Sequence, residues 1–237
     1  MLRRYGYMLG PDPGSTASAF VGGVVSTNAG GMRCKIERDS YHTIDQAQFV
    51  LTSGDIVDTR DGDEAFARQC PRLHAELLEL RDRIRADEPL TQRLRGKFSI
   101  RNTNGLRVDA FLDEDEPVRI LMRLFAGFEG IFGAFTELEM RAIELPKKKA
   151  VTWAVLPDIR NAAGYVAQLV HAGAEACELL VSDVMKRSVG QFEQAPAEWA
   201  DIDDQTCEMG LEMVAEKPFE SIATLLERAS RPRATLI

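Results

Sequence analysis

The sequence predicts an α+β fold for this 237-residue chain. Three observations support that prediction: a β-hairpin pattern near residue 50, an amphipathic helix soon after it, and a β-α-β pattern that starts at residue 150. The period of the apolar residues distinguishes strands from helices, because side chains alternate along a strand and recur every three to four residues along a helix. A chain of this length has room for one large domain or two ordinary ones.

The first predicted element is a hairpin in the stretch "AQFVLTSGDIVDT", which starts at Ala47. Phe49 and Leu51 lie two residues apart and therefore share one face of a strand. Ser53-Gly54-Asp55 forms the turn, and a second short apolar run begins at Ile56. The sequence therefore predicts two antiparallel strands joined by this turn.

The next element is a helix from Pro71 to Asp87. Its leucines and isoleucine recur at spacings of four, three and four residues, while charged residues occupy the remaining positions. Proline is acceptable in the first turn of a helix, where no intrahelical partner for its nitrogen is needed. We therefore expect one apolar face, formed by Leu73, Leu77, Leu80 and Ile84.

A second helix and a strand complete the first part of the chain. The residues from Asp113 to Pro117 are suited to start a helix that runs through "VRILMRLFAG" to Gly127. The stretch "AFTELEMRAIEL" alternates only partly in phase, which indicates a strand with a bulge. Pro146 and the three lysines after it mark a boundary, so we predict domains at 1–146 and 147–237.

The second part of the chain begins with a β-α-β unit. "AVTWAVL" from Ala150 is a strand, Asp158 is a helix N-cap, and Gly173 ends the helix. "CELLVSDV" then continues as a second strand or as a passage from strand to helix. A right-handed crossover of this kind favours an α+β sandwich. A last helix is predicted at 219–230.

Composition restricts the function classes. The net charge of −8 disfavours sequence-independent contact with nucleic-acid phosphates. No apolar run approaches the roughly 18 residues that a membrane span needs, and residues 1–14 lack the apolar core of a secretory signal. The four cysteines form no CxxC pair, which predicts reduced thiols in a cytoplasmic protein with no zinc site or iron–sulfur cluster. The histidines His42, His74 and His171 are expected to be structural or surface residues.

Glycine is unusually dense in "VGGVVSTNAGGM", which starts at Val21 and which we interpret as glycine turns beside a strand of valines. Glycine costs about 0.5–1 kcal/mol in regular structure relative to alanine, so such a cluster marks a sharp bend or a close approach. The segment is neither the GxGxxG pattern nor a P-loop. Two interpretations stay equal here: backbone that wraps a polar cofactor, or a tight turn packed against a neighbouring strand.

The order of several motifs adds information. "GPDPGSTASAFVGGVVSTNAGGMR" is followed by "SYHTIDQAQFVLTSGDIVDT", "KFSIRNTNGL", "DEDEPVRILMRLFAGFEGIFGAFTELEMRAI" and the β-α-β unit that ends in "ELL". In this order they closely resemble the FAD-linked oxidases of the vanillyl-alcohol-oxidase type over residues 5–182. The resemblance is greatest to the flavoprotein subunits of D-lactate dehydrogenase and glycolate oxidase, and to the larger D-2-hydroxyacid dehydrogenases fused to an iron–sulfur module.

The resemblance implies a fold and a cofactor. It makes residues 1–146 the second half of an FAD-binding domain, and residues 147–237 the start of a ferredoxin-like α+β cap domain over the substrate. The domain's first pyrophosphate loop and the cap's histidine-bearing segment are not found in this sequence. Glycines without side chains let the flavin and its diphosphate approach the backbone, and Thr27 and Asn28 are expected to hydrogen-bond flavin oxygens. The FAD-binding residues implied are Pro13, Gly14, Ser15, Gly22, Gly23, Thr27, Asn28, Gly30, Gly31, Gly127, Glu129, Gly130 and Gly133.

The reaction implied is oxidation of a small D-2-hydroxy acid such as D-lactate, glycolate or D-2-hydroxyglutarate, with hydride transfer to FAD. Arg33, Arg38 and Arg101 are candidates to pair with the substrate carboxylate, a solvent-facing role being the alternative for each. No catalytic base or metal ligand is assigned. The partners implied are a complementing chain or an iron–sulfur electron-transfer protein. Two alternatives remain: a truncated or diverged non-catalytic relative that serves as a binding or assembly module, and an unrelated α+β domain.

Overall fold

The structure is a computed structural model. It describes residues 2–31, 33–146, 149–156, 159–171, 174–193, 195, 197–204, 207–214 and 235–236. The chain divides into two compact units, residues 1–145 and 146–237, and each is described by itself.

The first unit is built on a three-stranded antiparallel sheet of order β3-β2-β4, formed by β3 (Ile56–Asp58), β2 (Ile44–Leu51) and β4 (Gly133–Met140). The predicted hairpin is confirmed, with Phe49 opposite Val57. The register between β2 and β4 shifts twice, which confirms the predicted irregularity in the second of these strands. A separate two-stranded ribbon pairs β1 (Tyr7–Leu9) with β5 (Ala142–Glu144).

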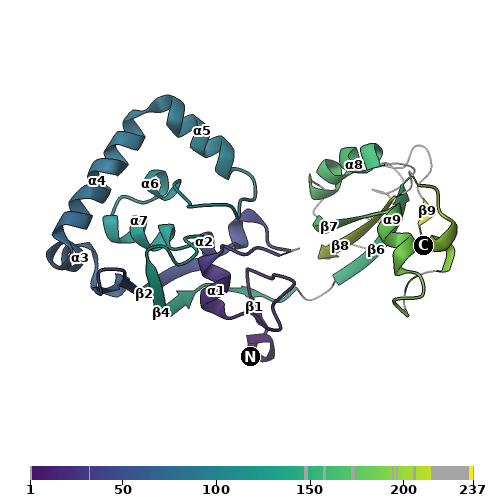
Figure 1. The fold of residues 1–237 in the computed structure, drawn as a ribbon, viewed down its shortest axis with the longest axis horizontal. Coiled ribbons are helices and arrows are strands. Elements are labelled where there is room, and N and C mark those ends of the chain that lie inside the picture. The colour runs from purple at the N-terminus through teal and green to yellow at the C-terminus, as the bar shows by residue number, and fades with distance from the viewer. Residues whose placement is uncertain are drawn as a thin grey trace. The chain divides into compact units, whose positions relative to one another are not determined.

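Helices pack on the sheet and rise above it. The predicted amphipathic helix is α4 (Pro71–Ala86), which with α5 (Glu88–Phe98) forms an arch over α6 (Ala110–Asp113) and α7 (Pro117–Leu124) (Figure 1). Leu77 of α4 is buried, whereas Leu80 is 40% exposed although its spacing assigns it to the apolar face. The predicted helix α7 is confirmed and most of its residues are buried. Short elements precede α4: α3 (Asp63–Gln69) and the 3-10 turns Leu2–Tyr5, Ile36–Arg38 and Thr59–Asp61.

Aromatic rings fill the core between α7 and the sheet. Phe49 of β2 stacks on Phe125 with ring centroids 4.3 Å apart. Phe125 in turn lies 4.4 Å from Phe128 and 5.4 Å from Phe135 of β4. Offset and edge-to-face ring pairs of this kind contribute beyond the apolar area that they bury. The core therefore fixes the segment after α7, which leads into the "GFEGIFG" glycines, against β2 and β4.

The valine-rich glycine segment is a helix and not a strand, which corrects the prediction for it. Residues Val21–Ser26 form α1, in which the Thr27 amide donates to the Gly23 carbonyl at 3.1 Å and Ser26 Oγ donates to the Gly22 carbonyl at 2.7 Å. Backbone donors and acceptors must be paired, and α1 pairs its own, since none of the described strands pairs with it. The next helix, α2 (Ser40–Thr43), is capped by the Asp39 carboxylate, which accepts from the His42 amide.

The second unit contains a four-stranded sheet of order β7-β8-β6-β9. Its elements are β6 (Lys149–Leu156), α8 (Ile159–His171), β7 (Ala174–Val181), α9 (Ser182–Ser188), the 3-10 turn Ala197–Asp201, β8 (Cys207–Val214) and β9 (Thr235–Leu236). Strand β8 is antiparallel to both β6 and β7, so β6 and β7 are parallel to each other. The predicted β-α-β unit and the passage from strand to helix after Val181 are confirmed. Asp158, Gly173 and the helix predicted at 219–230 lie outside the described residues.

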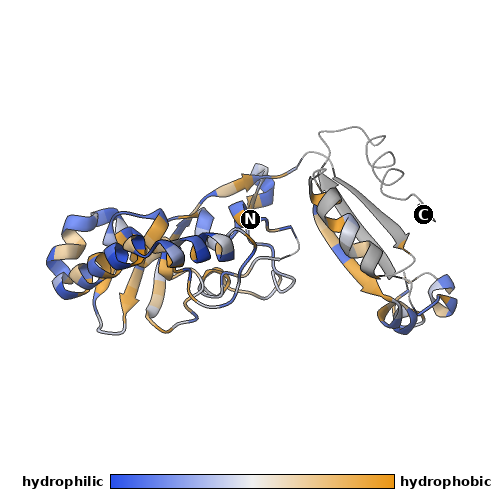
Figure 2. Cartoon of the chain, turned by 90° about the horizontal axis from the view of Figure 1, so that it is seen from above, coloured by the Kyte–Doolittle hydropathy of each residue, from blue (hydrophilic) through white to orange (hydrophobic). Residues whose placement is uncertain are grey.

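The hydropathy of the first unit agrees with helices that cover a sheet. Figure 2 shows hydrophilic residues along the outer helices of the first unit and hydrophobic residues in its strands. Such a pattern is expected where one face of a sheet is covered and helices meet water with their other side. In the part of the chain that the structure describes, no helix has both the length and the apolar character needed to cross a bilayer.

Candidate functional site

Three of the segments singled out in the sequence meet at the end of α1. The Gly127 amide donates to the Val25 carbonyl at 3.0 Å, and the Glu129 amide donates to the Ser26 carbonyl at 2.8 Å. The Asn28 side-chain amide donates to the Asn102 carbonyl at 3.3 Å. The glycine-rich segment, the "RNTNG" loop and the "GFEG" turn are therefore adjacent, although they are far apart in the sequence.

The turn Asn28–Gly31 is also fixed to the segment upstream of α1. The Asp12 amide donates to the Gly30 carbonyl at 2.6 Å, and Asp12 forms a parallel bridge with Gly31. Gly31 has a φ of +97°, and a Cβ atom added there would lie 1.7 Å from the Asp12 carbonyl oxygen. Only glycine fits this position, for both conformational and steric reasons. The Arg33 side chain adds an ion pair, with its Nε 2.8 Å from Asp12 Oδ2.

Asn28 is the central side chain of the turn. It is 2% exposed and has a left-handed φ of +43°, which asparagine tolerates better than most residues. Its Nδ2 donates to Asp39 Oδ2 at 3.2 Å, and its Oδ1 accepts from the Tyr41 amide at 3.2 Å. Both ends of the amide are therefore engaged inside the protein. Thr27 Oγ1 donates to the Gly23 carbonyl at 2.9 Å and is exposed, so its oxygen is accessible as an acceptor.

A buried ionic network lies directly beneath this turn. Arg107, only 3% exposed, holds Asp39 Oδ2 at 2.8 Å with Nη1 and Asp109 Oδ2 at 2.6 Å with Nη2. Its guanidinium carbon lies 3.7 Å from the centre of the Tyr41 ring, and the Tyr41 hydroxyl donates to Asp113 at 2.8 Å. Buried charges persist in proteins where they are paired and hydrogen-bonded, as they are here. The network therefore holds the segments around residues 28, 40 and 107 together.

The network shifts the pKa values of its members. Burial raises the pKa of Asp39, but the hydrogen bonds and charge of His42 and the charge of Arg107 outweigh burial, so the pKa lies below its ordinary value. Burial and the neighbouring carboxylates of Asp109 and Asp113 raise the pKa of Tyr41. Asp39 is therefore an anion and Tyr41 a neutral phenol at neutral pH.

Sequence reasoning did not find this network. The signal available was the pair Arg107 and Asp109, which alternate with apolar residues in "GLRVDAF". Charged residues at alternate positions of an apolar run are typical of a solvated strand face, so the pattern alone does not indicate burial. The partner Asp39 lies 68 residues away in the chain.

The glycines that the resemblance implicates fall into two groups. Four have another part of the chain within 3.3 Å of where a Cβ would lie, which is backbone at three of them and the flexible side chain of Arg101 at the fourth: Gly31, Gly127, Gly133 and Gly30. The other four have open space where a Cβ would lie: Gly14, Gly22, Gly23 and Gly130. For Gly31, Gly127 and Gly133 a tight turn or a close approach of backbone is sufficient explanation. For the second group no such contact is present among the described residues.

The open glycine backbone lies beside a cavity. A cavity of about 430 Å³ is lined by Asp12, Pro13, Thr16, Val21 and Val24, among other residues. Of the predicted FAD-binding residues, Pro13 lines it, and the lining residues Val21 and Val24 flank Gly22 and Gly23 in the sequence of α1. Accessible peptide groups beside an apolar wall suit a ligand that combines a diphosphate with a ring system. The residues present therefore fit a dinucleotide cofactor. Ser15 is exposed next to them.

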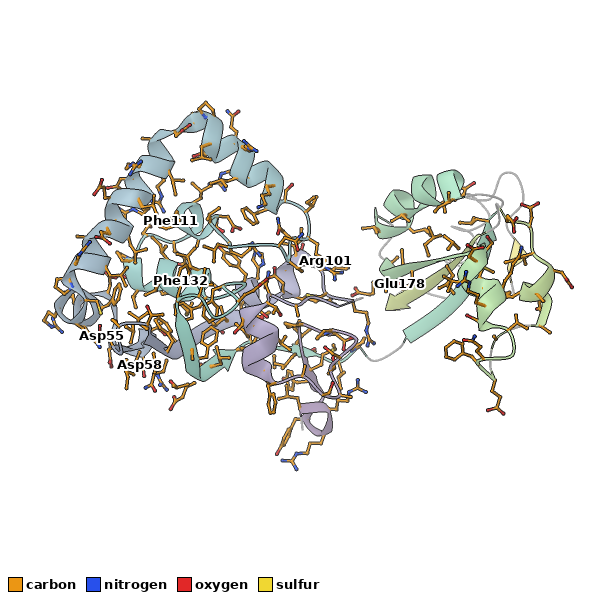
Figure 3. The ribbon with its side chains drawn as sticks, in the orientation of Figure 1. Asp55, Asp58, Arg101, Phe111, Phe132 and Glu178 are labelled. Atoms are coloured by element: carbon orange, nitrogen blue, oxygen red, sulfur yellow. The ribbon has the colours of Figure 1, made fainter. Side chains whose placement is uncertain are left out.

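A larger cavity lies elsewhere in the first unit. It has a volume of about 630 Å³ and is walled mainly by leucines of α4 and α7, with Phe111 and Phe132 inside the arch (Figure 3). None of the predicted FAD-binding residues lines it. This cavity is the larger of the two, but a site is identified by its chemistry as well as its volume, and Pro13 and the residues of α1 favour the smaller one.

Histidines and cysteines supply no metal site in the described part of the chain. No group of three or more histidine, cysteine, aspartate or glutamate side chains there is arranged to hold a metal ion. His42 Nδ1 lies 2.7 Å from Asp39, and His74 Nε2 lies 2.8 Å from Asp63. Burial raises the pKa of Cys34 to about 12, so this thiol stays protonated at neutral pH.

The chain has detectable sequence similarity to proteins of known function. Residues 1–60 match the family described as FAD binding domain. The chain is 25% identical over 195 residues to a D-2-hydroxyglutarate dehydrogenase of Pantoea ananatis (strain AJ13355), a match that covers 78% of this chain. The chain is therefore similar to FAD-binding oxidoreductases. It spans 18% of the length of that dehydrogenase.

Solved structures establish the fold of this chain. Two structures of alkyldihydroxyacetonephosphate synthase superpose on it with TM-scores of 0.55 and 0.57 at 14% and 15% sequence identity. They cover 96% and 99% of this chain, which corresponds to 34% and 36% of theirs. The predicted α+β fold of the vanillyl-alcohol-oxidase type is thereby confirmed. The match to the FAD binding domain confirms FAD as the cofactor. The individual FAD-binding residues and the domain assignments at 1–146 and 147–237 stay predictions.

Proposed function

We propose that this chain is part of an FAD-dependent dehydrogenase that oxidises a small D-2-hydroxy acid, such as D-lactate, glycolate or D-2-hydroxyglutarate. The observation that carries the proposal is the meeting of the Asn28–Gly31 turn, the Arg101–Gly105 loop and the Gly127–Gly130 turn beside accessible glycine backbone. The name of the Pantoea relative supports a hydroxy acid as the substrate class.

Some of these residues would contact FAD directly, and others would shape the site. Backbone at Gly14, Gly22, Gly23 and Gly130 is accessible and would contact the cofactor directly. The packed glycines and Asn28 instead shape the turn. When bound, FAD supplies the acceptor for the hydride that leaves the carbinol carbon of the substrate. The chain contributes binding, orientation and a positive charge for the carboxylate.

The experiment is spectroscopic. The purified 237-residue chain is titrated with FAD, and bound flavin is followed by its visible absorbance and fluorescence. D-Lactate, glycolate and D-2-hydroxyglutarate are then added without oxygen, with the L-enantiomers of the two chiral acids as controls. We expect bound flavin that bleaches with at least one D-acid or glycolate and not with the L-acids. A protein that stays colourless in excess FAD would contradict the proposal.

A second candidate is a binding or assembly module completed by another chain. It is favoured by large apolar side chains that are exposed near α1: Tyr5 is 63%, Phe20 is 87% and Val21 is 46% exposed. Exposed apolar groups of this kind mark interaction surfaces. Light scattering tests the case in which the other chain is a second copy, since a module that self-associates through this surface becomes monomeric when Phe20 is replaced by serine. For the dehydrogenase, the proposed partners are a complementing chain or an iron–sulfur electron-transfer protein.

The proposed location is the cytoplasm. Cys34, Cys70 and Cys177 are free thiols, and a reducing compartment preserves them. Burial raises the pKa of all three, which slows their oxidation. Fractionation of cells that express the tagged chain checks this proposal.

A further inference from the structure

Arg101 lies flat against the backbone of the glycine turn. If Gly30 carried a Cβ atom, it would be 2.9 Å from Arg101 Nε and 3.1 Å from both Cζ and Nη2. The guanidinium plane therefore covers Gly30, and Gly30 is buried beneath it. Arg101 belongs to the loop that follows α5 (Figure 3), and the Asn28 side chain holds this loop through the Asn102 carbonyl.

Arg101 differs from the other arginines near the turn. Arg33 pairs with Asp12, and Arg107 is buried between Asp39 and Asp109. Arg38 also interacts within the protein. Among the described residues, Arg101 has no hydrogen bond or ion pair to another side chain, and it is exposed. Of the three arginines considered for carboxylate binding, it is therefore the one whose charge is available to a ligand.

The chemistry of this position is specific. A guanidinium offers parallel N–H donors that match a carboxylate or a phosphate in a two-point hydrogen bond. Here it rests on a turn that Asp12, Asn28 and Gly31 already fix, so little motion has to be lost when an anion binds.

We propose that Arg101 is the oxyanion receptor of this site and that Gly30 lacks a side chain in order to seat it. The anion is the carboxylate of the hydroxy acid or the diphosphate of FAD, which present the same oxygen chemistry. This inference rests on the proposed function, and the arms of the experiment separate the two sources and the two proposals.

The first arm of the experiment substitutes the charged side chain of Arg101. Arg101→Gln removes it and Arg101→Lys keeps it without the two-point geometry, while Arg83→Gln removes an exposed arginine of α4 as the matched control. FAD affinity is measured by fluorescence quenching, and KM and kcat are measured with the best hydroxy acid. A loss of about tenfold or more in FAD affinity assigns the diphosphate, and a comparable rise in KM with little change in kcat assigns the carboxylate. Arg101→Lys recovers only part of either loss, and Arg83→Gln behaves as wild type.

The second arm moves the arginine without removing it. Gly30→Ala pushes against the end of a flexible side chain, so the protein folds while the guanidinium is displaced. We expect the same loss as in Arg101→Gln, and no further loss when both changes are combined, because both remove one interaction. Circular dichroism and urea unfolding verify that each variant is folded. Additive losses would overturn the role of Gly30.

The third arm does not depend on flavin. Inorganic pyrophosphate and oxalate are titrated calorimetrically into the flavin-free 237-residue chain and into the Arg101→Gln and Arg83→Gln variants. Binding of either anion that is lost only in Arg101→Gln supports the inference even if the chain binds no FAD and the proposed function fails. If neither anion binds, or if all three proteins bind equally, Arg101 is not an oxyanion receptor.

Discussion

Asn28 donates a hydrogen bond from Nδ2 to the Asp39 carboxylate at 3.2 Å, and through it the glycine turn is joined to the buried Asp39–Arg107 ion pair. The position of the turn is thus set by charges that solvent does not reach. A cofactor bound to the backbone at Gly22 and Gly23 would therefore depend on Asp39 and Arg107, two buried residues that it does not contact. This relationship makes Asn28 a positioning residue for the site.

The first prediction concerns Asn28. Asn28→Ala leaves the Tyr41 amide and part of Asp39 without a partner and puts alanine in a left-handed conformation. We expect the free energy of unfolding in urea to fall by about 1–3 kcal/mol, the usual range for an unpaired buried polar group. Asn28→Gly is the matched control for the backbone, since glycine adopts the same φ without strain. If Asn28→Ala were as stable as wild type, the amide would not anchor the turn.

The second prediction concerns pH. Burial raises the pKa of Asp39, but His42 and Arg107 together lower it by more than burial raises it. The folded state therefore keeps this carboxylate ionised to a lower pH than the unfolded chain does. Its contribution to stability is therefore complete above the unfolded value of 3.8 and is lost as the pH falls through the lower folded value. We expect the free energy of unfolding to decline below about pH 4, in part because of Asp39.

Variants separate Asp39 from the other carboxylates. Asp39→Asn removes the titrating group, so its unfolding free energy depends less steeply on pH in the acid range while being lower at pH 7. Asp61→Asn, which changes an exposed aspartate, is the control and keeps the wild-type slope. Equal acid slopes for wild type and Asp39→Asn would show that the pKa of Asp39 is not shifted on folding.

The third prediction concerns Arg107. Removing one partner of a buried ion pair costs about 3–5 kcal/mol because the remaining charges stay buried and unpaired. Arg107→Met, which fills a similar volume without charge, is therefore expected to lower the free energy of unfolding by about that amount. Arg107→Lys keeps the charge but cannot hydrogen-bond to Asp39 and Asp109 in the same two-sided way. Its free energy of unfolding is therefore expected to lie between those of wild type and Arg107→Met. Denaturant unfolding is followed by circular dichroism of the helices, since both tryptophans, Trp153 and Trp199, lie in the second unit and do not report on Arg107. A methionine variant within 1 kcal/mol of wild type would contradict the account.

Local patterns predicted much of the fold. The hairpin at β2 and β3, helix α4 and the β-α-β unit each depend on a period that a short stretch of sequence displays. Helix α1 was predicted as a strand because Val21, Val24 and Val25 favour strands. A strand needs a partner, and no stretch of sequence shows by itself whether one is available. The six residues of α1 pair their own backbone instead.

The site was predicted only in part. Motif order indicated the glycine turns, and open space at Gly22 and Gly23 agrees with a ligand there. The contacts that hold the turn join residues that are 74 and 68 positions apart, between Asn28 and Asn102 and between Asp39 and Arg107. Periodicity reports which face of an element is apolar and cannot report such pairs. The distinction between packed and open glycines likewise requires coordinates.

The last prediction uses that distinction. At Gly23 of α1 an added methyl group meets nothing within 4 Å, and alanine is favoured over glycine in a helix by about 0.5–1 kcal/mol. Gly23→Ala is therefore expected to leave the protein as stable as wild type or slightly more so. If FAD lies on this backbone, the same change weakens FAD binding, measured by fluorescence quenching, by at least several-fold.

Gly31→Ala is the matched comparison. There the methyl group would lie 1.7 Å from the Asp12 carbonyl oxygen at a φ of +97°, so the turn itself must move. A left-handed conformation alone costs about 1–3 kcal/mol for a residue other than glycine, and the steric overlap adds to this. We expect a marked loss of stability in urea together with weaker FAD binding. The contrast is decisive: a stable Gly23→Ala variant with unchanged FAD affinity would mean that the cofactor does not contact α1, whatever Gly31→Ala does.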